Sequence, residues 1–347
     1  MYKKQRPAPV ELDDDLLPRK PDPLKSLFIT MSAYEWLRNG RGEDKPKMLF
    51  GEFWHQYELA ILLADTNVGK SVLAVQIGNS LAASCPINSR FSIETAPLQV
   101  AYIDFELSGM QFRQRYMNDS TREDFDFAIG FYRSGFNPTI EMPPAYSSFD
   151  DFIDAAIEFQ VKYLNADVLI IDNITCLRSG AQNTADALTI MKKLKALKTR
   201  LQISILVLAH TPKRNPANPI TRNDLQGSKM LINFADSAFA LGESHRNPGL
   251  RYLKQVKQRA TQLVYGEDNV CLCRITKPAN GLQFDFEGTA HEREHLRPQN
   301  YFDKEQLATQ INQLAAQGLS QRQISAKLNI GLGTVNRVIN KEDGKVA

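Results

Sequence analysis

The sequence predicts an α/β domain built on a mainly parallel sheet, followed by a small all-α unit. Between residue 59 and about residue 286, apolar strand-like runs alternate with helical stretches, as where Val168–Asp172 precedes the helical segment 185–201. Strands that are apolar on both faces and separated by helices form parallel sheets covered on both sides. After residue 236 the strand-like runs follow one another without helices, which predicts an antiparallel extension of the sheet.

Composition and charge set limits on the class of protein. The chain has 347 residues, of which 43% are hydrophobic, and a net charge of +3. This is enough apolar material for a buried core, while any basic surface for a partner must be local. The four cysteines lack zinc-site spacing, so buried free thiols are a better interpretation than a disulfide or a metal site. Since no signal peptide or long apolar run is present, we expect a cytoplasmic protein with no membrane partner.

We divide the chain into four segments. Residues 1–26 contain five prolines and clustered charges, which predicts a flexible tail. Residues 27–290 hold the α/β domain, residues 291–302 are a polar linker, and residues 303–347 form a separate helical domain.

One eight-residue motif lies between the apolar run 59–63 and the helical stretch 72–83. The phosphate-binding P-loop consists of a strand, a tight loop and a helix, with Gly-Lys-Ser at the start of the helix. Its backbone N–H groups would cradle a triphosphate, Lys70 would reach the β- and γ-phosphates of ATP, and Ser71 would hold Mg²⁺. The motif consists of Ala64, Asp65, Thr66, Asn67, Val68, Gly69, Lys70 and Ser71.

The P-loop motif departs from its usual pattern at its first position. Ala64 stands where the pattern has glycine, and alanine does not accept a backbone with positive φ. A chance Gly-Lys-Ser in a loop is one alternative interpretation. A nucleotide-binding protein with little hydrolysis is another, and the departure at Ala64 motivates it.

Polar residues end three of the predicted strands. Asp172 ends the run 168–171 and would hold Mg²⁺ through water. Glu106 follows the strand 99–105 and would act as the general base, with Asp104 as the alternative. His210 ends the next strand and would sense the γ-phosphate. Polar residues often end strands for other reasons, but ligands bind at the carboxyl ends of parallel strands, so three together predict a site.

These motifs resemble those of the RecA-like P-loop ATPases, specifically the hexameric helicase branch that includes DnaB and the plasmid RepA helicases. The resemblance implies a RecA-like NTPase core of the broad AAA ATPase class, with ATP and Mg²⁺ as ligands. It also implies that Glu106 is the catalytic glutamate and that His210 is the sensor. The matching segments are Ala64–Ser71, Tyr102–Glu106, Leu169–Asp172, Leu206–His210 and Lys254–Arg259.

The same resemblance implies that a Lys-x-Arg pair reaches the nucleotide of a neighbouring subunit. Lys257 and Arg259 fit that pattern, in a ten-residue run with four basic residues and no acid. An arginine supplied across an interface neutralises charge in the transition state. The alternative is a solvated strand face. If the pair acts in this way, the active protein is a homo-oligomer, a ring or a filament, because a monomer lacks the completing residue. A hexamer is one such form.

Two loops are candidates for gripping single-stranded DNA in a channel. Residues 178–186 follow the strand of Asp172, and residues 211–229 follow His210. In the family such loops hold the DNA phosphates, whereas the alternative is an ordinary surface loop. The basic residues of the second loop are Lys213, Arg214, Arg222 and Lys229.

The C-terminal segment 318–339 has the pattern of a helix-turn-helix. Ser320 and Gln323 form a capping box for a first helix, and Thr334 is expected to cap a second one. On the second helix Asn336, Arg337 and Asn340 face outward, as a surface that reads base edges and phosphates. We expect Thr334, Asn336 and Arg337 to bind duplex DNA. The alternative is a small protein-interaction module, because residues 301–347 carry only six basic and four acidic residues.

Together these observations predict an oligomeric ATP-dependent DNA helicase or translocase of RepA type, with a role in replication or in the maintenance of a mobile element. The rival prediction is a DNA-binding ATPase that serves as a regulatory or accessory factor and unwinds nothing.

Overall fold

The structure is a computed structural model that describes residues 27–40, 45–177, 184–211, 214–224, 229–278, 280–298, 301–328 and 330–343. Its contacts divide the chain into two compact units, Met1–Pro46 and Lys47–Ala347. The predicted tail 1–26 lies outside the described residues. In the first unit, α2 (Ala33–Asn39) begins with a capping box in which Ser32 and Glu35 each accept a hydrogen bond from the other's backbone N–H group.

The second unit is built on a mixed sheet that has nine strands in the described part of the chain. Its order is β11-β10-β9-β8-β3-β7-β6-β4-β5, with parallel pairing from β8 to β5 and antiparallel pairing from β8 to β11. The strands are β3 (Leu59–Ala64), β4 (Val100–Asp104), β5 (Phe131–Gly135), β6 (Val168–Asp172), β7 (Ser204–His210), β8 (Ser237–Glu243), β9 (Leu250–Lys257), β10 (Val270–Thr276) and β11 (Gln283–Ala290). A separate antiparallel pair joins β1 (Met48–Phe50) to β2 (Trp54–His55).

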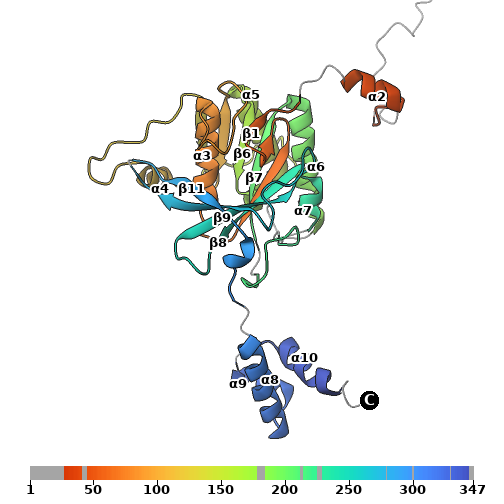
Figure 1. The fold of residues 1–347 in the computed structure, drawn as a ribbon. Helices are drawn as coiled ribbons and strands as arrows, with labels where there is room; N and C mark the ends of the chain where they lie inside the picture. The colour runs from red at the N-terminus through yellow and green to blue at the C-terminus, as the bar shows by residue number, and fades with distance from the viewer. Residues whose placement is uncertain are drawn as a thin grey trace, which may run out of the picture. The chain divides into compact units, whose positions relative to one another are not determined.

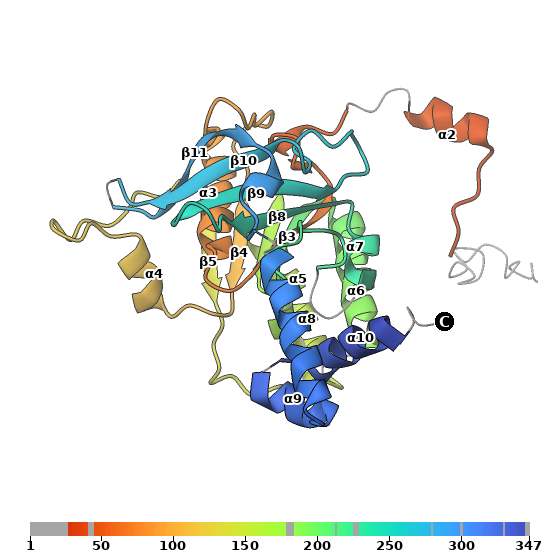
Figure 2. The ribbon, with the colours of Figure 1, turned by 60° about the horizontal axis from the view of Figure 1, so that its bottom comes forward.

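The structure confirms an α/β fold whose large sheet is mostly parallel. The predicted antiparallel extension is present, and Figure 2 shows β9, β10 and β11 side by side. One strand differs in detail, since β8 pairs in parallel with β3 on one side and antiparallel with β9 on the other. The antiparallel part of the sheet therefore begins with the pairing of β8 and β9. The sequence predicted that it would begin one strand earlier, at β8, where the strands stop being separated by helices.

Helices cover both faces of the parallel strands, with α3 on one face and α6 and α7 on the other (Figure 1). The buried stripe of α5 consists of Ile153, Ile157 and Val161, four residues apart, so one side of the helix faces the sheet. Ser148 caps this helix by accepting a hydrogen bond from the backbone N–H of Asp151 at 3.1 Å. The helices are α3 (Lys70–Ala83), α4 (Gly109–Arg115), α5 (Phe149–Tyr163), α6 (Thr184–Leu201) and α7 (Lys229–Phe234), with a short 3-10 turn, η3 (Ile174–Leu177).

The strand β5 was not predicted from the sequence. Its residues include Arg133, Ser134 and Gly135, and only its first residue, Phe131, is buried. A strand at the edge of a sheet has one neighbour, so its side chains need not form an apolar run. The short helix α4 was also missed, although Ser108 and Gln111 form its capping box.

A buried ion pair fixes the segment that follows β11. Lys254 of β9 pairs with Glu292 of the short 3-10 helix η4 (Glu292–Glu294), and Glu292 is fully buried. The second carboxylate oxygen of Glu292 accepts a hydrogen bond from the backbone N–H of Ile220 at 2.8 Å, while Lys254 Nζ donates to the carbonyl of Ile220 at 2.9 Å. These bonds satisfy both charges, as a buried pair requires. The first residues of the predicted linker 291–302 are thus packed against the sheet domain.

Three helices at the C-terminus have a hydrophobic core of their own. They are α8 (Tyr301–Ala316), α9 (Gln321–Leu328) and α10 (Leu332–Asp343), and their core contains Ile311, Leu314, Ile324 and Val335. The capping box of Ser320 and Gln323 is present at the start of α9. The expected cap at Thr334 is wrong, because α10 begins at Leu332 and the N–H of Thr334 already donates to Gly331 inside the first turn.

In the described residues, no helix combines the length and apolar character needed to cross a membrane. The four cysteines are free, and Cys271 and Cys273 are buried in the core on the α3 side of the sheet.

Candidate nucleotide site

The P-loop lies between the end of β3 at Ala64 and the start of α3 at Lys70. Two residues of the loop have positive φ, Asn67 at 63° and Gly69 at 108°. A Cβ atom on Gly69 would lie 2.5 Å from Ile275 Cδ1, so glycine is needed there for space as well as for backbone freedom. No side chain caps the first turn of α3. Its free N–H groups and the helix dipole therefore form a site for an anion.

Ala64 fits its position without strain. It is the last residue of β3, it pairs with His210 and Leu241 of the two flanking strands, and it is not among the residues with positive φ. Its carbonyl accepts a hydrogen bond from the N–H of Thr211 at 3.0 Å. The backbone here has ordinary strand geometry, so the absence of glycine gives no reason to expect weak hydrolysis.

Lys70 lies at the centre of the site with its ammonium group turned toward the loop. Lys70 Nζ donates to the carbonyls of Ala64 and Asp65 at 3.2 and 3.1 Å, and it lies 3.0 Å from His210 Nδ1. Burial lowers the pKa of Lys70, while the nearby carboxylates of Asp172 and Glu106 raise it. Phosphate oxygens approaching the loop would replace the two carbonyls as acceptors.

Ser71 and Asp172 meet beside Lys70 and supply oxygen atoms of the kind Mg²⁺ prefers. Asp172 is buried, and hydrogen bonds link its carboxylate to Ser71 and to the hydroxyl of Tyr102, the latter at 2.6 Å. Burial raises the pKa of Asp172, and the two hydrogen bonds oppose that shift. One hydroxyl and one carboxylate at the end of the P-loop fit the magnesium ion that accompanies a nucleotide.

Glu106, Asn173 and His210 form a connected group at the neighbouring strand ends. The N–H of Thr175 donates to Asn173 Oδ1 at 2.9 Å, which turns the Asn173 amide nitrogen toward Glu106, and that nitrogen donates to the Glu106 carboxylate. The ammonium of Lys70 can only donate, so His210 Nδ1 is the acceptor in that contact, and the Asn173 amide nitrogen lies 3.3 Å from His210 Nε2. His210 Nε2 lies 3.6 Å from Glu106 Oε1. The Asn173 amide and the His210 ring therefore both lie against the Glu106 carboxylate.

This surrounding keeps the Glu106 carboxylate ionised. The contact with His210 has the largest effect and lowers the pKa of Glu106, partial burial opposes it, and Lys70 and Asn173 lower it further. The side chain of Glu106 is 41% exposed, so water reaches it. An ionised, accessible carboxylate near the P-loop has the properties of a general base.

Asp104, the alternative base, has a structural role. Its two carboxylate oxygens accept hydrogen bonds from the backbone N–H groups of Glu106 and Leu107, both at 2.9 Å, and from Arg133 Nε at 2.9 Å. Its side chain is fully buried. Asp104 thus holds the turn that presents Glu106.

Asn173 and Tyr102 were not predicted as site residues. Asn173 directly follows Asp172, so its place at a strand end was a usable signal in the sequence. Tyr102 lies inside an apolar strand, and no local pattern indicates that its hydroxyl reaches Asp172.

Lys257 and Arg259 lie away from this P-loop. Arg259 contacts Asp236 at 3.4 Å, and Asp236 accepts a hydrogen bond from the N–H of Leu59, the first residue of β3. The P-loop follows the other end of β3, about 16 Å away for strand residues that rise about 3.3 Å each. Lys257 Nζ donates to the carbonyls of Ile232, Asn233 and Ala235, and burial lowers its pKa to about 8.

The predicted DNA-binding loops are described only in part. Residues 178–183, Lys213 and the side chain of Lys229 lie outside the described residues. Arg214 donates to the carbonyl of Asn218 at 2.6 Å, and Arg222 donates to the carbonyl of Val256 at 3.1 Å. On α10, Arg337 is exposed, while Thr334 and Asn336 are half-buried.

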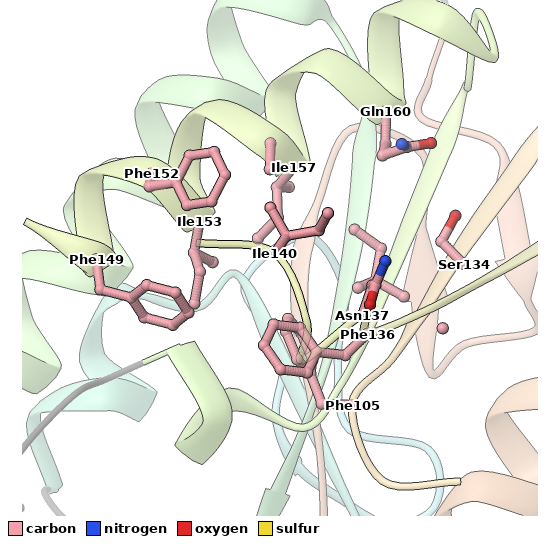
Figure 3. A pocket seen from close by; sticks show the side chains of 13 residues that line it. Phe105, Ser134, Phe136, Asn137, Ile140, Phe149, Phe152, Ile153, Ile157 and Gln160 are labelled. Carbon is pink, nitrogen blue, oxygen red and sulfur yellow. The ribbon is translucent and has the colours of Figure 1, made fainter. Parts of the chain in front are cut away.

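An apolar hollow of about 300 Å³ lies between α5 and strands β4 and β5 (Figure 3). Phe105, Phe136, Phe149 and Phe152 contribute to its lining, with Asn137, Ser134 and Gln160 at its polar edge. None of the charged residues of the P-loop group lines it, so it is distinct from the candidate nucleotide site.

The residues of the candidate nucleotide site fall within a known domain family. A protein-family model described as an AAA domain matches residues 33–216, more than half of the chain. No curated protein matches the sequence. Among solved structures, a KaiC-like protein from the hyperthermophilic archaeon Pyrococcus horikoshii OT3 is similar, with 15% identity and a TM-score of 0.46 over 67% of this chain and 91% of that one.

We predict that Asn173→Ala lowers kcat/KM for ATP about tenfold, the effect of one lost hydrogen bond to the base. Because Asn173 lowers the pKa of Glu106, its loss raises that pKa. The carboxylate is active when ionised, so the acidic limb of the pH profile of kcat/KM should move to higher pH. Cys176→Ala is the control, since Cys176 Sγ lies 3.8 Å from the oxygen of the Asn173 amide and not at the nitrogen that donates to Glu106. If the acidic limb of the pH profile does not move in Asn173→Ala, Asn173 does not lower the pKa of Glu106.

Proposed function

The chain belongs to the AAA domain family, and from this premise we propose that it is an ATP-dependent DNA helicase or translocase of RepA type, with a role in replication or in mobile-element maintenance. The observation that carries ATP hydrolysis is the convergence of Lys70, Asp172 and Glu106 at the ends of adjacent parallel strands. A P-loop, an acidic metal ligand and an accessible base are the parts that phosphoryl transfer requires.

Each residue has a defined part in hydrolysis. The N–H groups of residues 65–71 and the ammonium of Lys70 bind the phosphates, and Ser71 and Asp172 hold Mg²⁺. When bound, Mg²⁺ neutralises charge that develops on the β- and γ-phosphate oxygens. Glu106 accepts the proton of the attacking water. His210 contacts both Lys70 and Glu106. A shift of Lys70 toward the phosphates would therefore change the contacts of His210 with Glu106 and with the segment after β7.

Arg259 fits better than Lys257 as the residue given to a neighbouring subunit. The side chain of Arg259 is 48% exposed and makes one ion pair and one bond to the carbonyl of Asn233. The ammonium of Lys257 is held by three carbonyls at the end of α7. We assign the interface role to Arg259 and a positioning role to Lys257.

DNA binding is proposed at two places. The segment 214–224 would contact single-stranded DNA, and α10 would contact duplex DNA through Arg337, with Asn336 beside it. The support for the second place is a compact three-helix unit whose last helix exposes Arg337. A regulatory ATPase that binds DNA without unwinding is the competing proposal.

Strand separation distinguishes a helicase from a regulatory ATPase that binds DNA without unwinding it. We predict that the protein with ATP and Mg²⁺ separates a forked duplex, and that Lys70→Ala abolishes both hydrolysis and separation, because the charge on the β- and γ-phosphates is lost. A fluorescence assay of strand release, alongside phosphate release, measures both. Hydrolysis that is stimulated by DNA but separates no strands would favour the regulatory factor.

We predict that Arg259→Ala keeps nucleotide affinity within about twofold but lowers ATPase activity by ~10³-fold, the usual contribution of an arginine finger. Mixing Arg259→Ala with Lys70→Ala subunits should restore part of the activity, because some interfaces then combine one intact P-loop with one intact Arg259. The assay is phosphate release from assemblies whose mixing is confirmed by fluorescence transfer. Absence of recovery in mixed assemblies would contradict action across an interface.

We predict that removal of residues 301–347 leaves ATPase activity intact, since α8–α10 have their own core, and abolishes site-specific duplex binding. Arg337→Ala alone should weaken duplex binding by about 1–3 kcal/mol if it contacts a base bidentately. Binding to single- and double-stranded probes measures both effects. Unchanged duplex affinity after truncation would make the C-terminal unit a protein-interaction module.

A further inference from the structure

Three arginines surround a hollow that none of the predicted DNA-binding residues lines. The hollow has a volume of about 430 Å³ and lies where the loop after β8, the segment after β11 and residues 217–219 meet. We call it the arginine hollow. Its lining contains no carboxylate and consists of Ala217, Asn218, Pro219, Arg246, Arg293, Leu296, Arg297 and Pro298.

The guanidinium groups of the hollow are available to a ligand. Within the described residues, the side chains of Arg246 and Arg297 make no hydrogen bond or ion pair. Arg293 pairs with Glu267 at 3.3 Å, but its side chain is 81% exposed, and exposed pairs of this kind contribute little. Three positive charges around a hollow without a carboxylate create a positive potential that attracts an anion.

A buried framework holds the arginines in place. Glu292, next to Arg293, is fully buried and joins Lys254 to the backbone of Ile220. The N–H of Arg297 donates to the carbonyl of Pro216 at 3.1 Å. The N–H of His245, next to Arg246, donates to the carbonyl of His295 at 2.8 Å. The three segments are therefore bonded to one another, and the hollow is a formed part of the fold.

The arginine hollow adjoins the nucleotide site through one short segment. Arg214, Pro216 and Ile220 line a second hollow, of about 240 Å³, on the side of Asp65 and Thr66 of the P-loop. Residues 217–219 of the same segment line the arginine hollow. Ligands in the arginine hollow and in this second hollow would contact two sides of one stretch of chain.

We propose that the arginine hollow binds the sugar–phosphate backbone of single-stranded nucleic acid. The inference rests on the proposed function. It extends the surface of the protein that binds single-stranded DNA beyond residues 211–229. Arginine pairs with phosphate through two parallel hydrogen bonds, which suits three arginines spread over one concave surface. Leu296, Pro219 and Pro298 add apolar contacts for sugars and unstacked bases. A hollow admits a flexible single strand more readily than the stiff, convex backbone of a duplex.

The test compares two triple variants of the full-length protein that lose the same charge. In the first, Arg246, Arg293 and Arg297 are each changed to glutamine. In the control, Lys47, Arg122 and Lys192, which are exposed on other elements, are each changed to glutamine. The affinity for a twenty-residue thymidine oligonucleotide is measured by fluorescence anisotropy from 50 to 300 mM salt.

We expect the first variant to bind the oligonucleotide at least tenfold more weakly at low salt and the control to stay within twofold of the wild type. Three lost phosphate contacts should reduce the slope of log K against log salt by about 2, since each contributes about 0.7 for single strands. ATP affinity, measured by calorimetry, and thermal stability should match the wild type and thereby show that the variant is folded.

The possible failures are distinguishable. If wild type binds no single-stranded DNA, the proposed function itself fails. If both variants bind single-stranded DNA as tightly as the wild type does, the arginine hollow is not part of the DNA-binding surface. If the first variant loses affinity only for a duplex of the same length, the assignment to single strands is wrong. Equal loss in both variants would show an effect of net charge alone.

Discussion

The parallel register of four buried strands decides where every polar group of the nucleotide site lies. Ala64 at the end of β3 stands opposite His210 at the end of β7, and Asp104 at the end of β4 stands opposite Asp172 at the end of β6. The strand interiors are packed on both faces, so ionisable side chains are placed at the strand ends. Because the strands run in the same direction, these ends meet at one edge of the sheet.

Much of this arrangement could be predicted from local patterns. Continuous apolar runs gave β3, β6 and β7 almost to the residue, and Gly-Lys-Ser gave the start of α3. The edge strand β5 was missed because partial exposure removes the apolar run that marks a buried strand. The bonds of Asn173 to Glu106 and of Tyr102 to Asp172 depend on which side chains the register brings together. That information is contained in the strand pairing and not in any local spacing.

The second half of the chain places Arg259 at the end of β3 that lies away from the P-loop. The strands β8 and β9 carry Arg259 to the start of β3, beside Asp236, where it has no access to the P-loop of its own chain. Asp236 also pairs with Lys198 at 2.8 Å, so the position of Arg259 is linked to the end of α6. The exposed side of Arg259 is the part that the proposal assigns to a neighbouring subunit.

The ion pair between Lys254 and Glu292 has a mechanical consequence. Pro298 and Tyr301 are three residues apart, so the chain between them reaches no more than about 11 Å when extended. A load on the helices α8–α10 would therefore be transmitted within a few residues to the N–H of Arg297, bonded to Pro216, and to the buried Glu292, bonded to Ile220. The pull would act first on the segment 214–220 and on β9. Tension in the C-terminal part of the protein would thus reach the chain beside the P-loop before the rest of the sheet.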